Sequence, residues 1–113
     1  MTKHFLDLTH EEFWILCLNA KTEVVSTHKL SVGGYDSTPV CIRKIMTYVL
    51  ESNASSIIMI HNHPSGVLKP SEADKAVTVR IAIGLGIFQV TLADHLIMTD
   101  QSYFSFRDHG LLE

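Results

Sequence analysis

The feature that most constrains this sequence is a short apolar run that ends directly in two histidines. Residues 55–66 read SSIIMIHNHPSG. The run from Ile57 to Ile60 is typical of a strand that is buried on both faces. Pro64 has no backbone N–H to donate, so the strand should end before it. The sequence therefore predicts a central strand whose polar end carries His61 and His63.

Apolar periodicity and breaker residues predict further elements on both sides of this strand. Strands are predicted at 13–18 and 23–30, followed by a loop at 32–39. A helix then starts at Ser37 or Thr38, and its apolar face consists of Ile42, Ile45, Met46 and Val49. After the strand at 57–60, a helix at 71–83 is ended by Gly84 and Gly86, and strands follow at 88–92, 95–98 and 103–106. This order, β-β-α-β-α-β-β-β, predicts the α/β class, with a mixed β-sheet flanked by helices.

The composition predicts one globular domain over residues 1–113, because 46% of the 113 residues are apolar. No apolar run approaches the ~20 residues of a membrane span, and the N-terminus lacks the apolar core of a signal peptide. Cys17 and Cys41 lie in apolar surroundings without CxxC spacing. They are interpreted as reduced thiols of a cytoplasmic protein, with a disulfide between them as the alternative.

The charge pattern argues against strong non-specific binding to nucleic acid. The formal net charge is −3, and the nine lysines and arginines are dispersed along the chain. Without a concentrated positive field there is little counterion release to drive such binding. A nucleic-acid partner is therefore unsupported by charge, although it is not excluded.

The two histidines and a later aspartate form the set of side chains that catalytic zinc uses. His61 lies at the carboxyl end of its strand, where α/β sheets bind ligands. If the strand stays extended through Asn62, His61 and His63 point to the same side, with Cα atoms ~6.5–7 Å apart at ~3.3 Å per residue. Asp74 lies in the first turn of the next helix, on the same side as Ser71. Two imidazoles and one carboxylate would leave a fourth zinc position for water.

Hydrolysis at such a metal also needs a group that moves a proton and a donor to the oxyanion. The best candidate for the proton is Glu12, directly before the first apolar strand. Glu11 is its close rival, and Glu51 and Glu72 are further candidates. Ser71 could donate a hydrogen bond to the oxyanion.

Structural roles can explain some of the same residues. Ser71-Glu72-Ala73-Asp74 is an S-x-x-D sequence, which is typical of a helix N-cap with a carboxylate in the first turn. This role can coexist with a role in the site. Asp94-His95 indicates either a turn and strand start or support for a ligand. The remaining histidines are interpreted as surface or structural residues: His4, His10, His28 and His109.

The spacing H-x-H-P-x6-S-x2-D from His61 to Asp74 resembles the JAMM motif of the JAB1/MPN-domain metalloproteases. The segments HNHPSG, PSEAD and ADHLIMTDQSYFSFRDHGLL resemble the bacterial RadC branch of that family. The resemblance implies a sheet flanked by helices, in a layout related to that of cytidine deaminases. It also implies that His61, His63 and Asp74 bind Zn²⁺ and that Ser71 stabilises the tetrahedral intermediate. The family pattern E-F-x-x-L matches Glu12 better than Glu11, which implies Glu12 as the proton shuttle.

The chain departs from the RadC pattern in one helix and in its length. Residues 42–44 are Ile-Arg-Lys where a Pro-Arg-Glu run is usual. Full-length RadC-like proteins also carry an N-terminal helix-hairpin-helix region, so the chain is expected to be either a stand-alone protein or the C-terminal domain of a longer one. The oligomeric state stays open, a dimer included.

Two classes of function compete. The first is a zinc-dependent metallopeptidase or isopeptidase that acts on an unidentified peptide or protein substrate. The alternative is a RadC-like binding or scaffold domain associated with DNA repair and without hydrolytic activity. An HNH nuclease is disfavoured because those letters name dispersed residues, and a zinc deaminase is set aside because the P-C-x-x-C part of its signature is absent.

Overall fold

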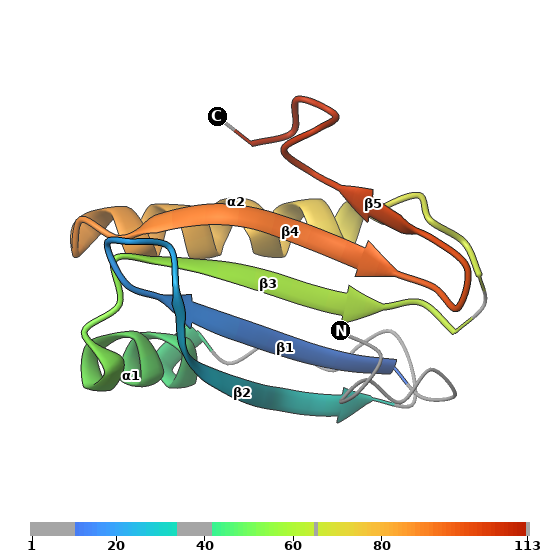
Figure 1. The fold of residues 1–113 in the computed structure, drawn as a ribbon. Coiled ribbons are helices and arrows are strands. Elements are labelled where there is room, and N and C mark those ends of the chain that lie inside the picture. The colour runs from blue at the N-terminus through green and yellow to red at the C-terminus, as the bar shows by residue number, and fades with distance from the viewer. Residues whose placement is uncertain (1–10, 34–41, 65, 113) are drawn as a thin grey trace.

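The computed structural model describes residues 11–33, 42–64 and 66–112 and arranges them as one sheet with two helices (Figure 1). The elements are β1 (Glu11–Leu18), β2 (Val24–Gly33), α1 (Ile42–Ser52), β3 (Ser56–Asn62), α2 (Glu72–Ile87), β4 (Thr91–Met98) and β5 (Tyr103–Ser105). The strand order in the sheet is β2-β1-β3-β4-β5. Only the β3–β4 pair is parallel, and α2 makes the crossover between these two strands. The predicted mixed α/β sheet is confirmed.

Both helices pack against the same face of the sheet. The larger apolar cluster combines Ile45 of α1 and Ile81 of α2 with alternate residues of β1 and β3, among them Ile15 and Met59. The apolar face predicted for the first helix is confirmed, because Ile45 and Val49 are buried while Ile42 and Met46 pack against the cluster. The predicted start of that helix and most of the predicted loop at 32–39 lie outside the described residues.

The second helix continues past the two glycines that were expected to end it. α2 runs to Ile87, so the prediction that it ends at Gly84 and Gly86 is wrong. A Cβ on Gly84 would lie 3.1 Å from the Cε of Met46 on α1. Gly84 therefore lies against the Met46 side chain of α1, and the helix continues through both glycines despite the cost of ~1 kcal/mol for a glycine in a helix interior.

A single strand replaces the two strands predicted at 88–92 and 95–98. β4 spans Thr91–Met98, and its pairing with β3 skips Ala93, since Ile57 pairs with Leu92 and Ile58 with Asp94. The prediction of a turn at Asp94 is wrong because a bulge absorbs the irregularity. The Asp94 carboxylate accepts hydrogen bonds from Ser105 Oγ and from the backbone N–H of Arg107. The aspartate therefore anchors the C-terminal turn instead of ending the strand.

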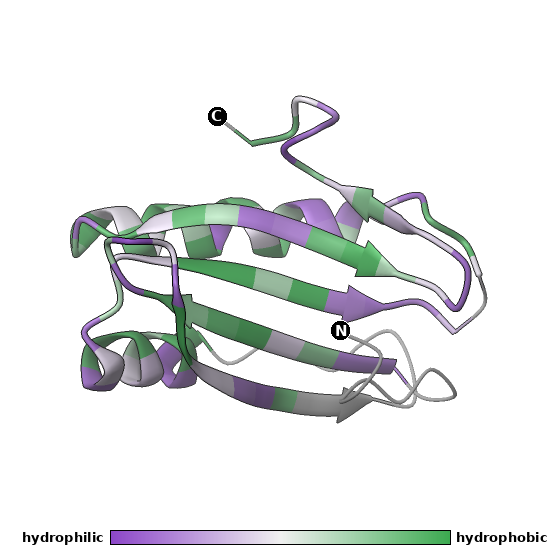
Figure 2. Cartoon of the chain, in the orientation of Figure 1, coloured by the Kyte–Doolittle hydropathy of each residue, from purple (hydrophilic) through white to green (hydrophobic). Residues whose placement is uncertain are grey.

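Hydrophilic residues lie at the end of the sheet where β1 begins and β3 ends. Figure 2 shows hydrophilic residues at the beginning of β1 and at the end of β3, beside apolar strand centres. The two ends are neighbours, since Phe13 pairs with His61 in the sheet. The topology therefore brings the start of the first strand next to the two histidines.

Two further observations bear on the thiols and on membranes. Cys17 is a buried free thiol, as expected, and Cys41 lies outside the described residues. Among the described residues, no helix is long and apolar enough to cross a membrane.

Candidate metal centre

His61 and His63 lie together at the carboxyl end of the central strand. β3 remains extended through Asn62, which fulfils the condition for the two side chains to share a side. The centroids of the two rings are 4.8 Å apart, with the planes nearly perpendicular. His61 is buried, and Nδ1 of His63 donates a hydrogen bond to the carbonyl oxygen of Val67 at 2.8 Å. This bond leaves Nε2 of His63 directed into the site.

Asp74 reaches both histidines from the first turn of α2. Its Oδ1 lies 3.3 Å from His61 Nδ1, and its Oδ2 lies 3.4 Å from His63 Nε2. Oδ2 also accepts the backbone N–H of Ser71, whose hydroxyl in turn accepts the N–H of Asp74, so that the pair forms a capping box. The Asp74 carboxylate therefore caps α2 and lies beside both histidines, while the role predicted for Ser71 in the site stays a prediction.

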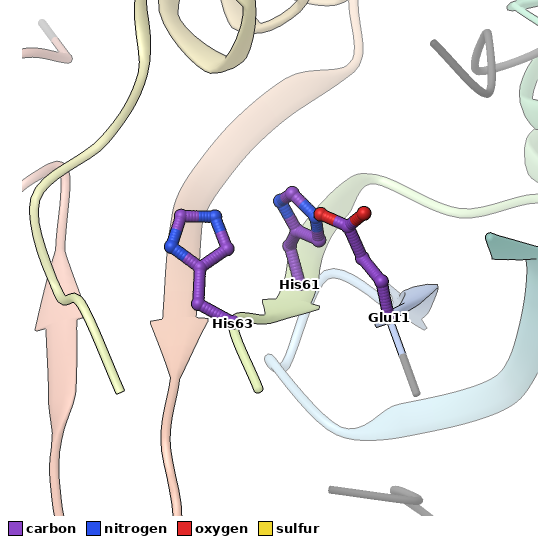
Figure 3. Close-up of side chains that lie close together, drawn as sticks. All are labelled: Glu11, His61 and His63. Carbon is purple, nitrogen blue, oxygen red and sulfur yellow. The ribbon is translucent and has the colours of Figure 1, made fainter. Parts of the chain in front are cut away.

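Glu11 completes the cluster from β1. Its Oε2 lies 2.6 Å from His61 Nε2. Glu11, His61 and His63 each offer one ligand atom, and these three atoms lie within 4.8 Å of one another. Figure 3 shows the ring of His61 between the carboxylate of Glu11 and the ring of His63. Glu11 on β1, His61 on β3 and His63 just beyond β3 therefore lie close together, and Asp74 on α2 lies close to both histidines.

The carboxylate of Glu12 lies on the opposite face of the sheet. Successive side chains of a strand alternate between faces, and Glu12 is part of β1 rather than before it. Its Oε1 accepts the indole N–H of Trp14 at 2.9 Å, and its Oε2 lies 3.9 Å from Lys29 Nζ. The geometry therefore favours Glu11 over Glu12 as the carboxylate that serves the site.

The other predicted carboxylates are exposed. Glu72 points away into solvent and pairs with Lys75 at 3.3 Å, and Glu51 lies exposed on α1. Within the described ranges, the one grouping of three or more candidate metal ligands is that of Glu11, His61 and His63.

The electrostatics of the cluster favour an ionised Asp74. Burial raises the pKa of this carboxyl, but its interactions with His61, His63 and the Ser71 N–H outweigh burial and hold the pKa well below its usual range. The pKa of His63 is raised by its contact with Asp74 and by its bond to Val67, against the lowering effect of burial. The site therefore presents a fixed negative charge beside two imidazoles.

The residues present fit a bound divalent cation. Nδ1 of His61 is buried and makes no hydrogen bond, although Asp74 Oδ1 lies 3.3 Å away. The edge of a tetrahedron with zinc–nitrogen bonds of ~2.0–2.1 Å is ~3.3 Å, close to the two separations between the histidines and Asp74. Two imidazoles with one carboxylate are a zinc donor set, and a cation would satisfy the unpartnered nitrogen.

Two residues near the site, Thr78 and His95, were not assigned from the sequence. Thr78 was missed, and the role of His95 was left open. His95 is fully buried inside β4, and its Nδ1 lies 2.6 Å from the hydroxyl of Thr78 on α2. His95 lies in the middle of β4, so the prediction that it starts a strand is wrong. Its buried contact with Thr78 is compatible with the alternative that it supports a ligand. Thr78 carried no signal, because a threonine within a helical pattern is unremarkable until its partner on another element is known.

Comparison with known proteins shows the family of this chain. The family model of the RadC-like JAB domain matches residues 1–111. The chain belongs to the RadC-like JAB domain family. A UPF0758 protein of Flavobacterium johnsoniae is 46% identical over 105 residues, which cover 93% of this chain and 46% of that protein. The UPF0758 protein YeeS of Escherichia coli K12 is 38% identical over 105 residues, covering 93% of this chain and 71% of YeeS.

This RadC-like JAB domain corresponds to only part of several relatives. The chain spans about half the length of the curated relatives from Flavobacterium johnsoniae and Porphyromonas gingivalis, with 46% and 47% of their lengths covered. What those whole proteins do is therefore not carried over to this chain by the similarity.

Proposed function

We propose that this domain is a zinc-dependent hydrolase of peptide or isopeptide bonds. The observation that carries the proposal is the convergence of His61, His63, Asp74 and Glu11 at one end of the sheet. In this proposal His61, His63 and Asp74 hold the zinc ion. The ion would supply a Lewis acid that polarises a carbonyl group and acidifies a water molecule.

Glu11 takes the role of proton shuttle. Its carboxylate lies 2.6 Å from Nε2 of His61, and Figure 3 shows it beside that ring. In this role the carboxylate would turn from Nε2 of His61 to the attacking water, accept a proton from it and deliver that proton to the leaving amine. The carboxylate of Glu12 instead accepts the indole N–H of Trp14, on the other face of the sheet.

Ser71 takes the role of oxyanion donor. Its hydroxyl oxygen accepts the backbone N–H of Asp74, which fixes the side chain at the start of α2. The hydroxyl proton can then be donated to the oxygen that becomes negative when the carbonyl is attacked. The positive end of the helix dipole at Ser71 favours the same negative charge.

The metal is tested by elemental analysis of the purified protein beside His63→Ala. We expect about one zinc per chain in the wild type and little in the variant, because metal affinity depends on the full donor set. Full retention of zinc by His63→Ala would contradict the assignment of the ligands.

The shuttle is tested by comparing Glu11→Gln with its neighbour Glu12→Gln, which serves as the matched control. Both are incubated with a peptide library and with isopeptide-linked protein conjugates, and the products are read by mass spectrometry. We expect Glu11→Gln to retain zinc and lose hydrolysis, while Glu12→Gln keeps both. Wild-type protein that carries zinc but cleaves neither substrate would favour the scaffold alternative, a binding domain without hydrolytic activity.

A further inference from the structure

The residues of the proposed metal site come from elements that must be aligned with each other. His61 ends β3, whereas Asp74 lies in the first turn of α2. Apolar packing by Ile81 and Leu85 holds α2 on the sheet, but the hydrophobic effect is non-directional. A slide of one residue along the helix axis would move Asp74 by ~1.5 Å, which exceeds the ~0.2 Å tolerance of a metal–ligand distance.

A buried polar contact between Thr78 and His95 is directional and can fix the position of α2 along the sheet. The two side chains lie on α2 and β4, are 2% and 0% exposed, and approach to 2.6 Å. Thr78 follows Asp74 by one helical turn, and its hydroxyl donates to the carbonyl oxygen of Asp74 at 2.7 Å. His95 pairs with Met59 of β3, two residues before His61. The contact therefore joins the turn that carries Asp74 to the strands that carry His61.

The hydrogen bonds determine which nitrogen of His95 carries the proton. Thr78 has one hydroxyl proton, which goes to the Asp74 carbonyl. The bond between the two side chains must then be donated by Nδ1–H of His95, which leaves Nε2 with a lone pair. Nε2 is buried without a hydrogen-bond partner, and the ring stacks on Phe106 at 4.4 Å. The imidazole is thus held neutral, in one tautomer and one orientation.

We propose that Thr78 and His95 are positioning residues that align the first turn of α2 with the sheet, so that Asp74 faces His61 and His63. The inference rests on the proposed metal site and adds two residues that do not touch the metal. Hydrogen bonds are directional and are strengthened in a buried environment, so one such bond can fix a register that apolar packing leaves adjustable.

The test compares zinc affinity in Thr78→Val, which keeps the shape but lacks the hydroxyl, and in Thr78→Ser, which keeps the hydroxyl. Affinity is measured by competition with a chromophoric chelator, and the visible spectrum of the Co²⁺-loaded protein reports the geometry. We expect zinc binding about 10–100-fold weaker in Thr78→Val, in line with the loss of other groups that orient metal ligands. Thr78→Ser should restore both the affinity and the spectrum.

A matched control is available on the other helix. Thr47 donates the same kind of hydroxyl bond to the carbonyl oxygen of Arg43 on α1, at 2.9 Å. We expect Thr47→Val to bind zinc as the wild type does. Equal weakening by Thr47→Val and Thr78→Val would show a general effect on helices and would overturn the proposal.

A double-mutant cycle with His95→Leu keeps the test decisive if one variant is less stable. All affinities are measured at a temperature at which every metal-free variant is folded, as checked by circular dichroism. If both residues act through one bond, the double variant Thr78→Val/His95→Leu should bind zinc no more weakly than either single variant. Additive losses, or an unchanged affinity in Thr78→Val, would overturn the inference.

Failure of this inference can be told apart from failure of the metal site. Wild-type zinc binding that depends on His63 but not on Thr78 would overturn the inference and leave the proposed function in place. Wild-type protein that binds no zinc would overturn both.

Discussion

Replacing His95 with leucine should make the stability of this domain less sensitive to acid. His95 is fully buried, and burial lowers its pKa from 6.5 to about 3. Below pH 6.5 the unfolded chain binds a proton at this position, whereas the folded chain does not until about pH 3. The folded state therefore loses stability as the pH falls through this window, and the full stability is present above it.

The size of the effect follows from the two pKa values. Each pH unit inside the window costs ~1.36 kcal/mol of unfolding free energy. Between pH 7 and pH 4.5, the contribution of His95 amounts to a loss of about 2.5 kcal/mol. The leucine variant lacks this contribution, so its free energy of unfolding should fall by about 2.5 kcal/mol less than that of the wild type. The difference also contains the electrostatic interactions of His95 with His61, Asp74 and His63, which the leucine variant loses.

The assay is urea unfolding of chelator-treated protein at pH 7, 5.5 and 4.5, followed by the fluorescence of Trp14, the one tryptophan of the sequence. Ile81→Val is the control for lost packing, because Ile81 is fully buried and does not titrate. It should lower stability by about 0.5–1.5 kcal/mol equally at every pH. Parallel pH dependences for wild type and His95→Leu would refute the reasoning.

Three further predictions concern stability and thiol reactivity. Ser71→Ala removes the acceptor that caps α2 and should lower the free energy of unfolding by about 1 kcal/mol in urea titrations; no change would show that the cap is dispensable. Gly110→Ala places a side chain at φ 73° and should cost about 1 kcal/mol. Gly86→Ala, at an exposed position of α2, should stabilise by about 0.5–1 kcal/mol; equal effects of the two would contradict the role of φ. Cys17 is 0% exposed, so in a Cys41→Ser background a colorimetric thiol reagent should modify it only as fast as the chain unfolds. Rapid labelling of that native protein would show that this part of the core opens.

Local pattern was sufficient for the architecture but not for two element boundaries. Apolar runs and periodicity predicted the hairpin, the central strand and the apolar face of α1. They placed the end of α2 too early, since Gly84 serves contact with Met46 rather than termination. They also divided β4 at Asp94, whose carboxylate is satisfied by the C-terminal turn. In both cases the deciding partner lies on an element distant in the sequence.

The sequence by itself determined that His61, His63 and Asp74 would lie near one another, because a strand end, a short connection and a helix start place them at one edge of the sheet. Only the tertiary structure decided which glutamate joins them. Glu11 and Glu12 are adjacent in the chain, and the point at which β1 begins sets which of the two faces the histidines. Strand side chains alternate with a period of two, so a shift of one residue exchanges the faces, and that register is settled by pairing across the sheet rather than by local sequence.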